Sequence, residues 1–144
     1  MNEKYEPLLL ENQVCFPLYA AARELIKKYD GALSELDLTY TQYVVMIVLW
    51  EKGSLTVKEL GEALYLDSGT LTPLLKRLEG KGLITRTRLA SDERSLSIAP
   101  THKGVALKDS ALAVPNSLLG AIGLTEKETQ TLRRLLYKIL ENAK

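Results

Sequence analysis

The sequence predicts a mainly α-helical chain that carries one small β-hairpin. Two observations support this fold class: apolar residues recur at helical spacing in most segments, and several of these segments begin with a capping box. A third is a short run of alternating apolar and polar residues, which is typical of a strand. The 144 residues, of which 46% are hydrophobic and 26% charged, fit a single soluble domain covering residues 1–144.

The first predicted helix covers residues 8–29, where apolar residues follow a helical period. Pro17 lies inside this segment and removes one helix hydrogen bond. We therefore expect either a kink there or a helix that starts late. Gly31 is the expected stop, because glycine adopts the backbone conformation that ends many helices.

Two capping boxes mark the next helices. Thr39 and Gln42 have the spacing at which side chains satisfy free backbone amides, and a continuous apolar run over 43–50 follows. Periodicity alone does not separate a buried helix from a buried strand here, but the box favours a helix. Thr56 and Glu59 form a second box, which predicts a short amphipathic helix.

A further helix begins at Asp67 or Ser68, either of which is a favourable N-cap residue, and stops near Gly80. Its leucines share one face at the spacing i, i+3, i+4, i+7: Leu71, Leu74, Leu75 and Leu78. The opposite face is small, hydroxylated and cationic, and consists of Gly69, Thr70, Thr72, Pro73, Lys76 and Arg77. We expect the leucines to pack on the core and the other face to stay exposed.

Residues 83–88 and 94–99 are predicted to form a hairpin around a turn-rich segment, with Leu96 and Ile98 facing inward. Thr101 caps another helix over about 102–120, which Pro115 interrupts.

A third capping box, Thr125 with Glu128, starts the final helix. Its apolar stripe comprises Leu132, Leu135, Leu136, Ile139 and Leu140. Two helices joined by a short turn and followed by a hairpin describe a winged helix-turn-helix, here over about residues 38–100.

The exposed face of the helix at 68–80 suits entry into a DNA groove. Ser68, Thr70 and Thr72 can bond phosphates or base edges, and Gly69 and Pro73 are compact enough to let the backbone approach. Lys76 and Arg77 can neutralise phosphates. The alternative is an ordinary solvated helix face.

Charge distribution supports the DNA interpretation, although the net charge of +1 is uninformative. Residues 76–94 have a local charge of +3, because six basic residues face three acidic ones: Lys76, Arg77, Lys81, Arg86, Arg88 and Arg94 against Glu79, Asp92 and Glu93. Arg86 and Arg88 share one strand face. Arg94 is placed to enter a minor groove, with Asp92 either fixing its guanidinium or forming a surface pair of little energetic value.

Several function classes are excluded by pattern. No run of about 18 apolar residues predicts a membrane span, and no secretory signal opens the chain, so we expect a cytoplasmic protein. One cysteine, Cys15, and one histidine, His102, make neither an intrachain disulfide nor a usual zinc site, so no metal or cofactor is expected. No catalytic triad or phosphate-binding loop is present, so an enzyme is not expected.

The quoted motifs resemble the MarR family of winged-helix repressors. The resemblance rests on residues 66–79, on Gly82-Leu83-Ile84, and on the hairpin residues Arg86, Arg88 and Asp92-Glu93-Arg94-Ser95. Residues 11–16, with Tyr19, Tyr29 and Tyr40, are similar to the one-cysteine branch of organic hydroperoxide resistance regulators (OhrR). Pro17 departs from that branch, where an ordinary helix former is usual.

The resemblance implies a single MarR-type domain that forms a homodimer through the lobe at about 8–30 and 102–143 and binds a pseudo-palindromic operator in double-stranded DNA. Cys15 is then the sensor of an organic hydroperoxide, with Tyr19, Tyr29 and Tyr40 around it. Ser68, Thr70, Pro73, Lys76 and Arg77 match the recognition helix, and Asp92 and Arg94 match the wing.

The residues alone leave the role of Cys15 open, because a lone cysteine on an apolar helix is often a small buried hydrophobic residue. The tyrosines are likewise typical of residues that fill a core. A sensor would be oxidised to sulfenic acid, then converted by a small thiol to a mixed disulfide or overoxidised, and the operator released. The alternatives are a MarR-type repressor released by a small aromatic ligand, with Cys15 inert, and a winged helix that binds protein instead of DNA.

Overall fold

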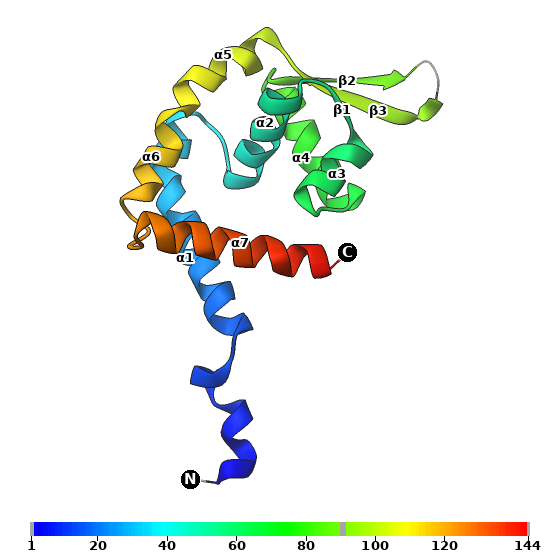
Figure 1. The fold of residues 1–144 in the computed structure, drawn as a ribbon. Coiled ribbons are helices and arrows are strands. Elements are labelled where there is room, and N and C mark those ends of the chain that lie inside the picture. Colours follow the sequence, from blue (N-terminus) through cyan, green and yellow to red (C-terminus); the bar gives the residue numbers. More distant parts are fainter. Residues whose placement is uncertain (1, 90–91, 144) are drawn as a thin grey trace.

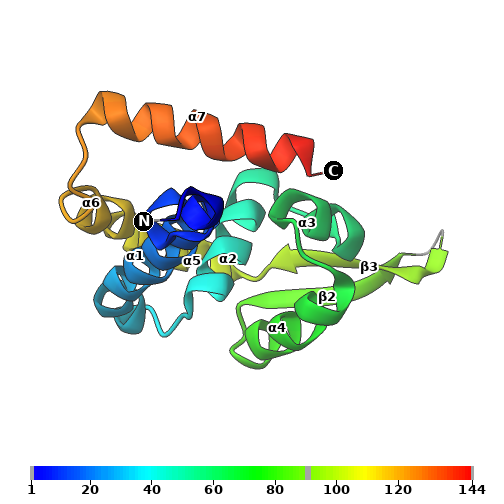
Figure 2. The same cartoon turned by 90° about the horizontal axis from the view of Figure 1, so that it is seen from below.

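The chain folds into a winged helix-turn-helix flanked by long helices from both ends of the sequence (Figures 1 and 2). The computed structural model describes residues 2–89 and 92–143, and at residues 89 and 92–95 it describes the backbone alone. The winged helix comprises three helices and three strands: α2 (Tyr40–Lys52), β1 (Leu55–Thr56), α3 (Val57–Leu64), α4 (Ser68–Gly80), β2 (Ile84–Leu89) and β3 (Asp92–Pro100). The predicted fold class is confirmed.

The first long helix, α1 (Cys15–Glu35), follows two short 3₁₀ helices, Glu3–Leu8 and Leu10–Asn12. Pro17 is the third residue of α1, where its missing N–H is among those that have no partner within the helix. Of the two expected outcomes, a kink at Pro17 or a helix that starts late, the structure shows the late start. The predicted stop at Gly31 is wrong, because α1 continues to bury Leu33 in the core.

The predicted caps are present. Thr39, Thr56 and Thr125 each accept a bond from the backbone three residues on, and the Gln42, Glu59 and Glu128 side chains bond back. The run at 43–50 is therefore helical. For α4 the cap is Asp67, whose Oδ1 accepts from the Thr70 backbone N–H at 2.7 Å.

The sheet is antiparallel in the order β1-β3-β2, and its hairpin projects from the body (Figure 1). Arg86 pairs with Ile98 across the hairpin, and Leu55 of β1 pairs with Ile98 from the other side. The hairpin was predicted. Strand β1 was not, because two residues are too few to show an alternating pattern.

The C-terminal part contains α5 (His102–Ala111), α6 (Ala113–Leu119) and α7 (Glu126–Asn142). The predicted interruption of the helix at 102–120 is confirmed, but it comes at Leu112 rather than at Pro115. Pro115 is the third residue of α6, a position where a missing N–H costs no helix bond. Across residues 2–89 and 92–143, no helix is both long enough and apolar enough to cross a membrane.

The core lies between α2, α4 and the sheet. All four leucines of the predicted apolar face of α4 are buried: Leu71, Leu74, Leu75 and Leu78. They share this core with residues of α2, including Val45, Met46 and Leu49. In contrast, within Cys15–Glu35 only Leu33 is buried, and within Glu126–Asn142 no residue is.

The junction between the core and α5 requires a glycine. A Cβ at Gly104 would overlap the Leu83 carbonyl oxygen and lie 3.2 Å from the Met46 side chain. The Trp50 Nε1 also donates to the Gly104 carbonyl at 2.8 Å, so the backbone there has little freedom to retreat.

We expect Gly104→Ala to lower the free energy of unfolding by at least about 2 kcal/mol, because the added methyl meets backbone that must shift. Urea denaturation measures this. The matched control is Gly120→Ala, where a Cβ meets nothing within 4 Å, and which should raise stability by no more than about 1 kcal/mol. Equal midpoints for both variants would contradict the prediction.

Candidate DNA-reading surface and thiol region

The exposed face of α4 carries every residue that the sequence assigned to it. All seven predicted residues are exposed: Ser68, Gly69, Thr70, Thr72, Pro73, Lys76 and Arg77. Thr72 Oγ1 donates to the Ser68 carbonyl at 2.7 Å, so its proton is used within the helix and its oxygen remains an acceptor. This face combines hydroxyl groups, two cations and compact residues on one side of a rigid helix.

The N-terminus of α4 is already capped. The hydrogen bond from the Thr70 backbone N–H lowers the pKa of Asp67, so this carboxylate stays ionised at the helix start. A phosphate near that end would meet the Asp67 charge as well as the helix dipole. The cations Lys76 and Arg77, rather than the helix terminus, are the main anion-attracting groups of α4.

Arg86 lies closer to α4 than the sequence suggested. Its Nη2 donates to Glu79 Oε1 at 3.0 Å, and only 20% of the Arg86 side chain is exposed. This hydrogen bond lowers the pKa of Glu79. Arg86, which was predicted to bind DNA, therefore ties strand β2 to the end of α4, whereas Arg88 on the same strand is exposed.

Lys81 is also turned inward. Its Nζ donates to Gln42 Oε1 at 3.0 Å and bonds to Asp37, so it too contributes little to an outward basic surface. The sequence counted six basic residues at 76–94, but those exposed among the described side chains are Lys76, Arg77 and Arg88. The Asp92 and Arg94 side chains, and hence their predicted contact, lie outside the described part of the chain.

Cys15 is exposed and is the first residue of α1, preceded by Val14, whose side chain makes no cap bond. The alternative of a small buried hydrophobic residue is therefore wrong for the single chain. Tyr19 lies one turn further on and is 63% exposed, with the Arg23 guanidinium 5.2 Å from its ring centre. The start of a helix is also a place where free backbone N–H groups favour negative charge.

Tyr29 and Tyr40 pack together across α1 and α2, with ring centres 4.9 Å apart. Tyr43 completes the cluster at 6.0 Å from Tyr29 and 6.4 Å from Tyr40. Tyr43 was not predicted as a site residue, because its place in a continuous apolar run gives it no distinguishing signal. Burial raises the pKa of Tyr29 to about 12 and also raises the pKa values of Tyr40 and Tyr43.

The predicted thiol site is thus divided within one chain. Cys15 and Tyr19 lie at the start of α1, whereas Tyr29, the one member of the tyrosine cluster on α1, lies 14 residues beyond Cys15 along that helix, about 21 Å away. No group of three or more potential metal ligands occurs in the part of the chain that the structure describes.

Comparisons with known proteins identify the family. A model described as the MarR family matches residues 38–96. The organic hydroperoxide resistance transcriptional regulator of Bacillus subtilis is 48% identical over 141 residues, which cover 98% of this chain and 96% of the relative. The chain belongs to the MarR family.

Solved MarR-family structures agree with this fold. Reduced AbfR of Staphylococcus epidermidis bound to DNA is 35% identical, covers 100% of both chains and superposes with a TM-score of 0.79. The disulfide-formed AbfR is 34% identical, with 95% of this chain and 96% of that chain covered and a TM-score of 0.65.

We expect Tyr29→Phe to remove the phase of tyrosine ionisation that occurs at the highest pH in the folded protein. Because Tyr29 has a pKa of about 12 when folded and about 10 when unfolded, its neutral form favours the native state. Its contribution is complete below pH 10 and is lost as the pH rises from 10 toward 12. Tyrosinate absorbance during an alkaline titration measures this. A wild-type phase near pH 12 that persists in Tyr29→Phe would contradict the assignment, and denatured protein is the control.

Proposed function

We propose that a homodimer of this chain is a transcriptional repressor that binds a pseudo-palindromic operator and releases it when an organic hydroperoxide oxidises Cys15. The observation that carries the DNA part is the exposed face of α4, which is polar and cationic directly opposite four buried leucines. The family and the identity to a hydroperoxide resistance regulator support the redox part.

The recognition helix α4 would lie in the major groove. Ser68, Thr70 and Thr72 offer hydroxyl oxygens to base edges or phosphates, and Lys76 and Arg77 neutralise phosphates. The wing would follow the adjacent backbone, with Arg88 and Arg94 as its candidate contacts and Asp92 beside Arg94. Arg86 would act indirectly, through Glu79 at the end of α4.

The dimer would form through the lobe at about residues 8–30 and 102–143, leaving the lobe at about 38–100 to bind DNA. Both α1 and α7 expose large apolar side chains, among them Leu18, Ile26, Leu132, Leu135, Tyr137 and Ile139. Exposed apolar surface of this extent is typical of a protein interface. A second chain would also bring its tyrosine cluster to the exposed Cys15.

The proposed chemistry is a two-electron oxidation. The Cys15 thiolate attacks one peroxide oxygen, the O–O bond breaks, and the alkoxide leaves and takes a proton as the alcohol. The sulfur becomes a sulfenic acid. Since Cys15 is the chain's one cysteine, a small external thiol then forms the mixed disulfide and releases water.

Added bulk at the start of α1 would shift the dimer helices and change the spacing of the two α4 helices. Binding to two half-sites depends on that spacing.

We expect Cys15→Ser to keep operator affinity but to lose the response to oxidant, because serine has no comparable nucleophile for the peroxide. Fluorescence anisotropy with a palindrome from the upstream region, with and without an organic hydroperoxide and a small thiol, measures both. Release by both proteins would favour an aromatic-ligand regulator or another redox site. No binding by the wild type would contradict the repressor itself.

We expect Lys76→Met to weaken binding to operator DNA and to scrambled DNA equally. It should also reduce the slope of log affinity against log salt by about 1, because one phosphate contact is lost. Titrations at several salt concentrations measure the slope. Lys52→Met, an exposed lysine at the end of α2, is the charge-matched control and should leave the slope unchanged. Equal slopes for wild type and Lys76→Met would exclude this contact.

A further inference from the structure

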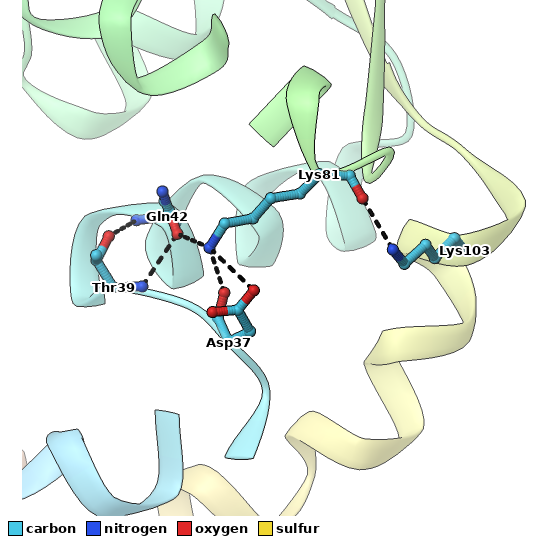
Figure 3. Close-up of polar contacts among 5 residues, drawn as sticks. All are labelled: Asp37, Thr39, Gln42, Lys81 and Lys103. Carbon is cyan, nitrogen blue, oxygen red and sulfur yellow. Dashed lines mark hydrogen bonds and ion pairs between the residues drawn. The ribbon is translucent and has the colours of Figure 1, made fainter. Parts of the chain in front are cut away.

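The turn that follows the recognition helix is bonded to two other parts of the chain through Lys81 (Figure 3). The Lys81 Nζ donates to Gln42 Oε1 at 3.0 Å and to the Asp37 carbonyl, and it lies 3.7 Å from Asp37 Oδ2. An ammonium group has three N–H donors and no acceptor. Two of these donors are used by Gln42 Oε1 and the Asp37 carbonyl, and the Asp37 carboxylate lies within ion-pair distance, so the ammonium group is directed inward.

Gln42 fixes where Lys81 can bond. Gln42 is 3% exposed, and its Oε1 also accepts a hydrogen bond from the Thr39 backbone N–H at 3.1 Å, as part of the capping box of α2. Both lone pairs of this oxygen are thus used, one by the cap and one by Lys81. Because the cap holds the amide in place, the end of the Lys81 side chain is tied to the start of α2.

The backbone of the same turn is tied to α5. Lys103 Nζ donates to the Lys81 carbonyl at 2.9 Å, and Thr101 Oγ1 donates to the Gly82 carbonyl at 2.6 Å (Figure 3 draws the Lys103 contact). The turn after α4 therefore contacts the α1–α2 loop through a side chain and the start of α5 through its backbone. Both partners adjoin helices of the proposed dimer lobe.

We propose that Lys81 is a positioning residue that sets the orientation of α4 relative to the α1–α2 loop and thereby transmits the state of Cys15 to the DNA-reading face. This rests on the proposed function. Asp37 lies two residues beyond the end of α1, whose other end is Cys15. A displacement of α1 moves Asp37, and the Lys81 bonds carry that movement to the end of α4.

Lys76 and Lys81 lie five residues apart in the sequence and make a matched pair. Lys76 is exposed on the DNA-reading face, whereas the Lys81 side chain is 29% exposed and its ammonium is bonded inward. Removing either removes one positive charge near α4. Only the loss of Lys81 also releases α4 from the loop after α1.

The test measures operator affinity of the full chain by anisotropy, for the reduced protein and for protein treated with an organic hydroperoxide and a small thiol, at several salt concentrations. We expect Lys81→Met to weaken reduced binding about fivefold without changing the salt slope, and to bring the ratio of reduced to oxidised affinity closer to one. Lys81→Arg, which keeps the charge and donors, should restore most of that ratio. Lys76→Met should change the slope and leave the ratio intact.

Lys103→Met is the second variant, since it removes the bond from α5 and leaves the cap of α2 untouched. It should shift the ratio in the same direction. If Lys81→Met reduces the slope of log affinity against log salt but leaves the ratio of reduced to oxidised affinity unchanged, Lys81 is a phosphate contact and the inference is overturned. A lower unfolding midpoint with unchanged operator binding would also overturn it. If the wild type binds the operator but does not release it after oxidation, both the redox function and the role of Lys81 are overturned. If the wild type releases the operator normally, and the ratio of reduced to oxidised affinity is unaltered in Lys81→Met and Lys103→Met, the inference alone is overturned.

Discussion

The burial of four leucines along one side of α4 is the constraint on which the functional surface depends. Leu71, Leu75 and Leu78 are at most 1% exposed and Leu74 is 8% exposed. Each such burial stabilises the fold by about 1.5–3 kcal/mol relative to an exposed side chain, so no rotation of α4 about its axis is tolerated. Because the helix cannot rotate, its hydroxylated and cationic face must point outward. The position of the proposed DNA-reading surface is thus a consequence of how the core packs.

The parts of the fold that the sequence predicted are those fixed by local chemistry. A capping box joins residues three apart, so Thr39 with Gln42 could be identified without knowing the fold. The errors arose where tertiary packing decides. Helix α1 continues past Gly31 because Leu33 finds a place in the core, and β1 exists because β3 offers it a partner. Neither cause is visible within a short window of sequence.

The candidate site divides in the same way. Helical spacing alone identified the exposed face of α4. The inward turn of Arg86 and Lys81 was missed, because their partners are Glu79 on another element and Gln42, 39 residues away from Lys81. Charge counted along the sequence therefore overstated the basic surface. Tyr29 and Tyr40 were predicted to lie around Cys15, and this stays a prediction. Their contact with Tyr43 was not predicted, because it forms only when α1 packs on α2.

The reduced number of outward cations bears on how such a protein would release DNA. With Asp67 at the N-terminus of α4 and two nearby basic side chains paired inward, one lobe has few groups to hold phosphates among the side chains that the structure describes. In the proposed dimer, tight binding would then come from engaging both half-sites at once, which raises affinity by orders of magnitude only while the geometry allows it. A small change in the separation of the lobes would remove that gain without breaking any contact within either lobe. A dimer made of individually weak lobes is therefore suited to switching by a modest displacement of α1.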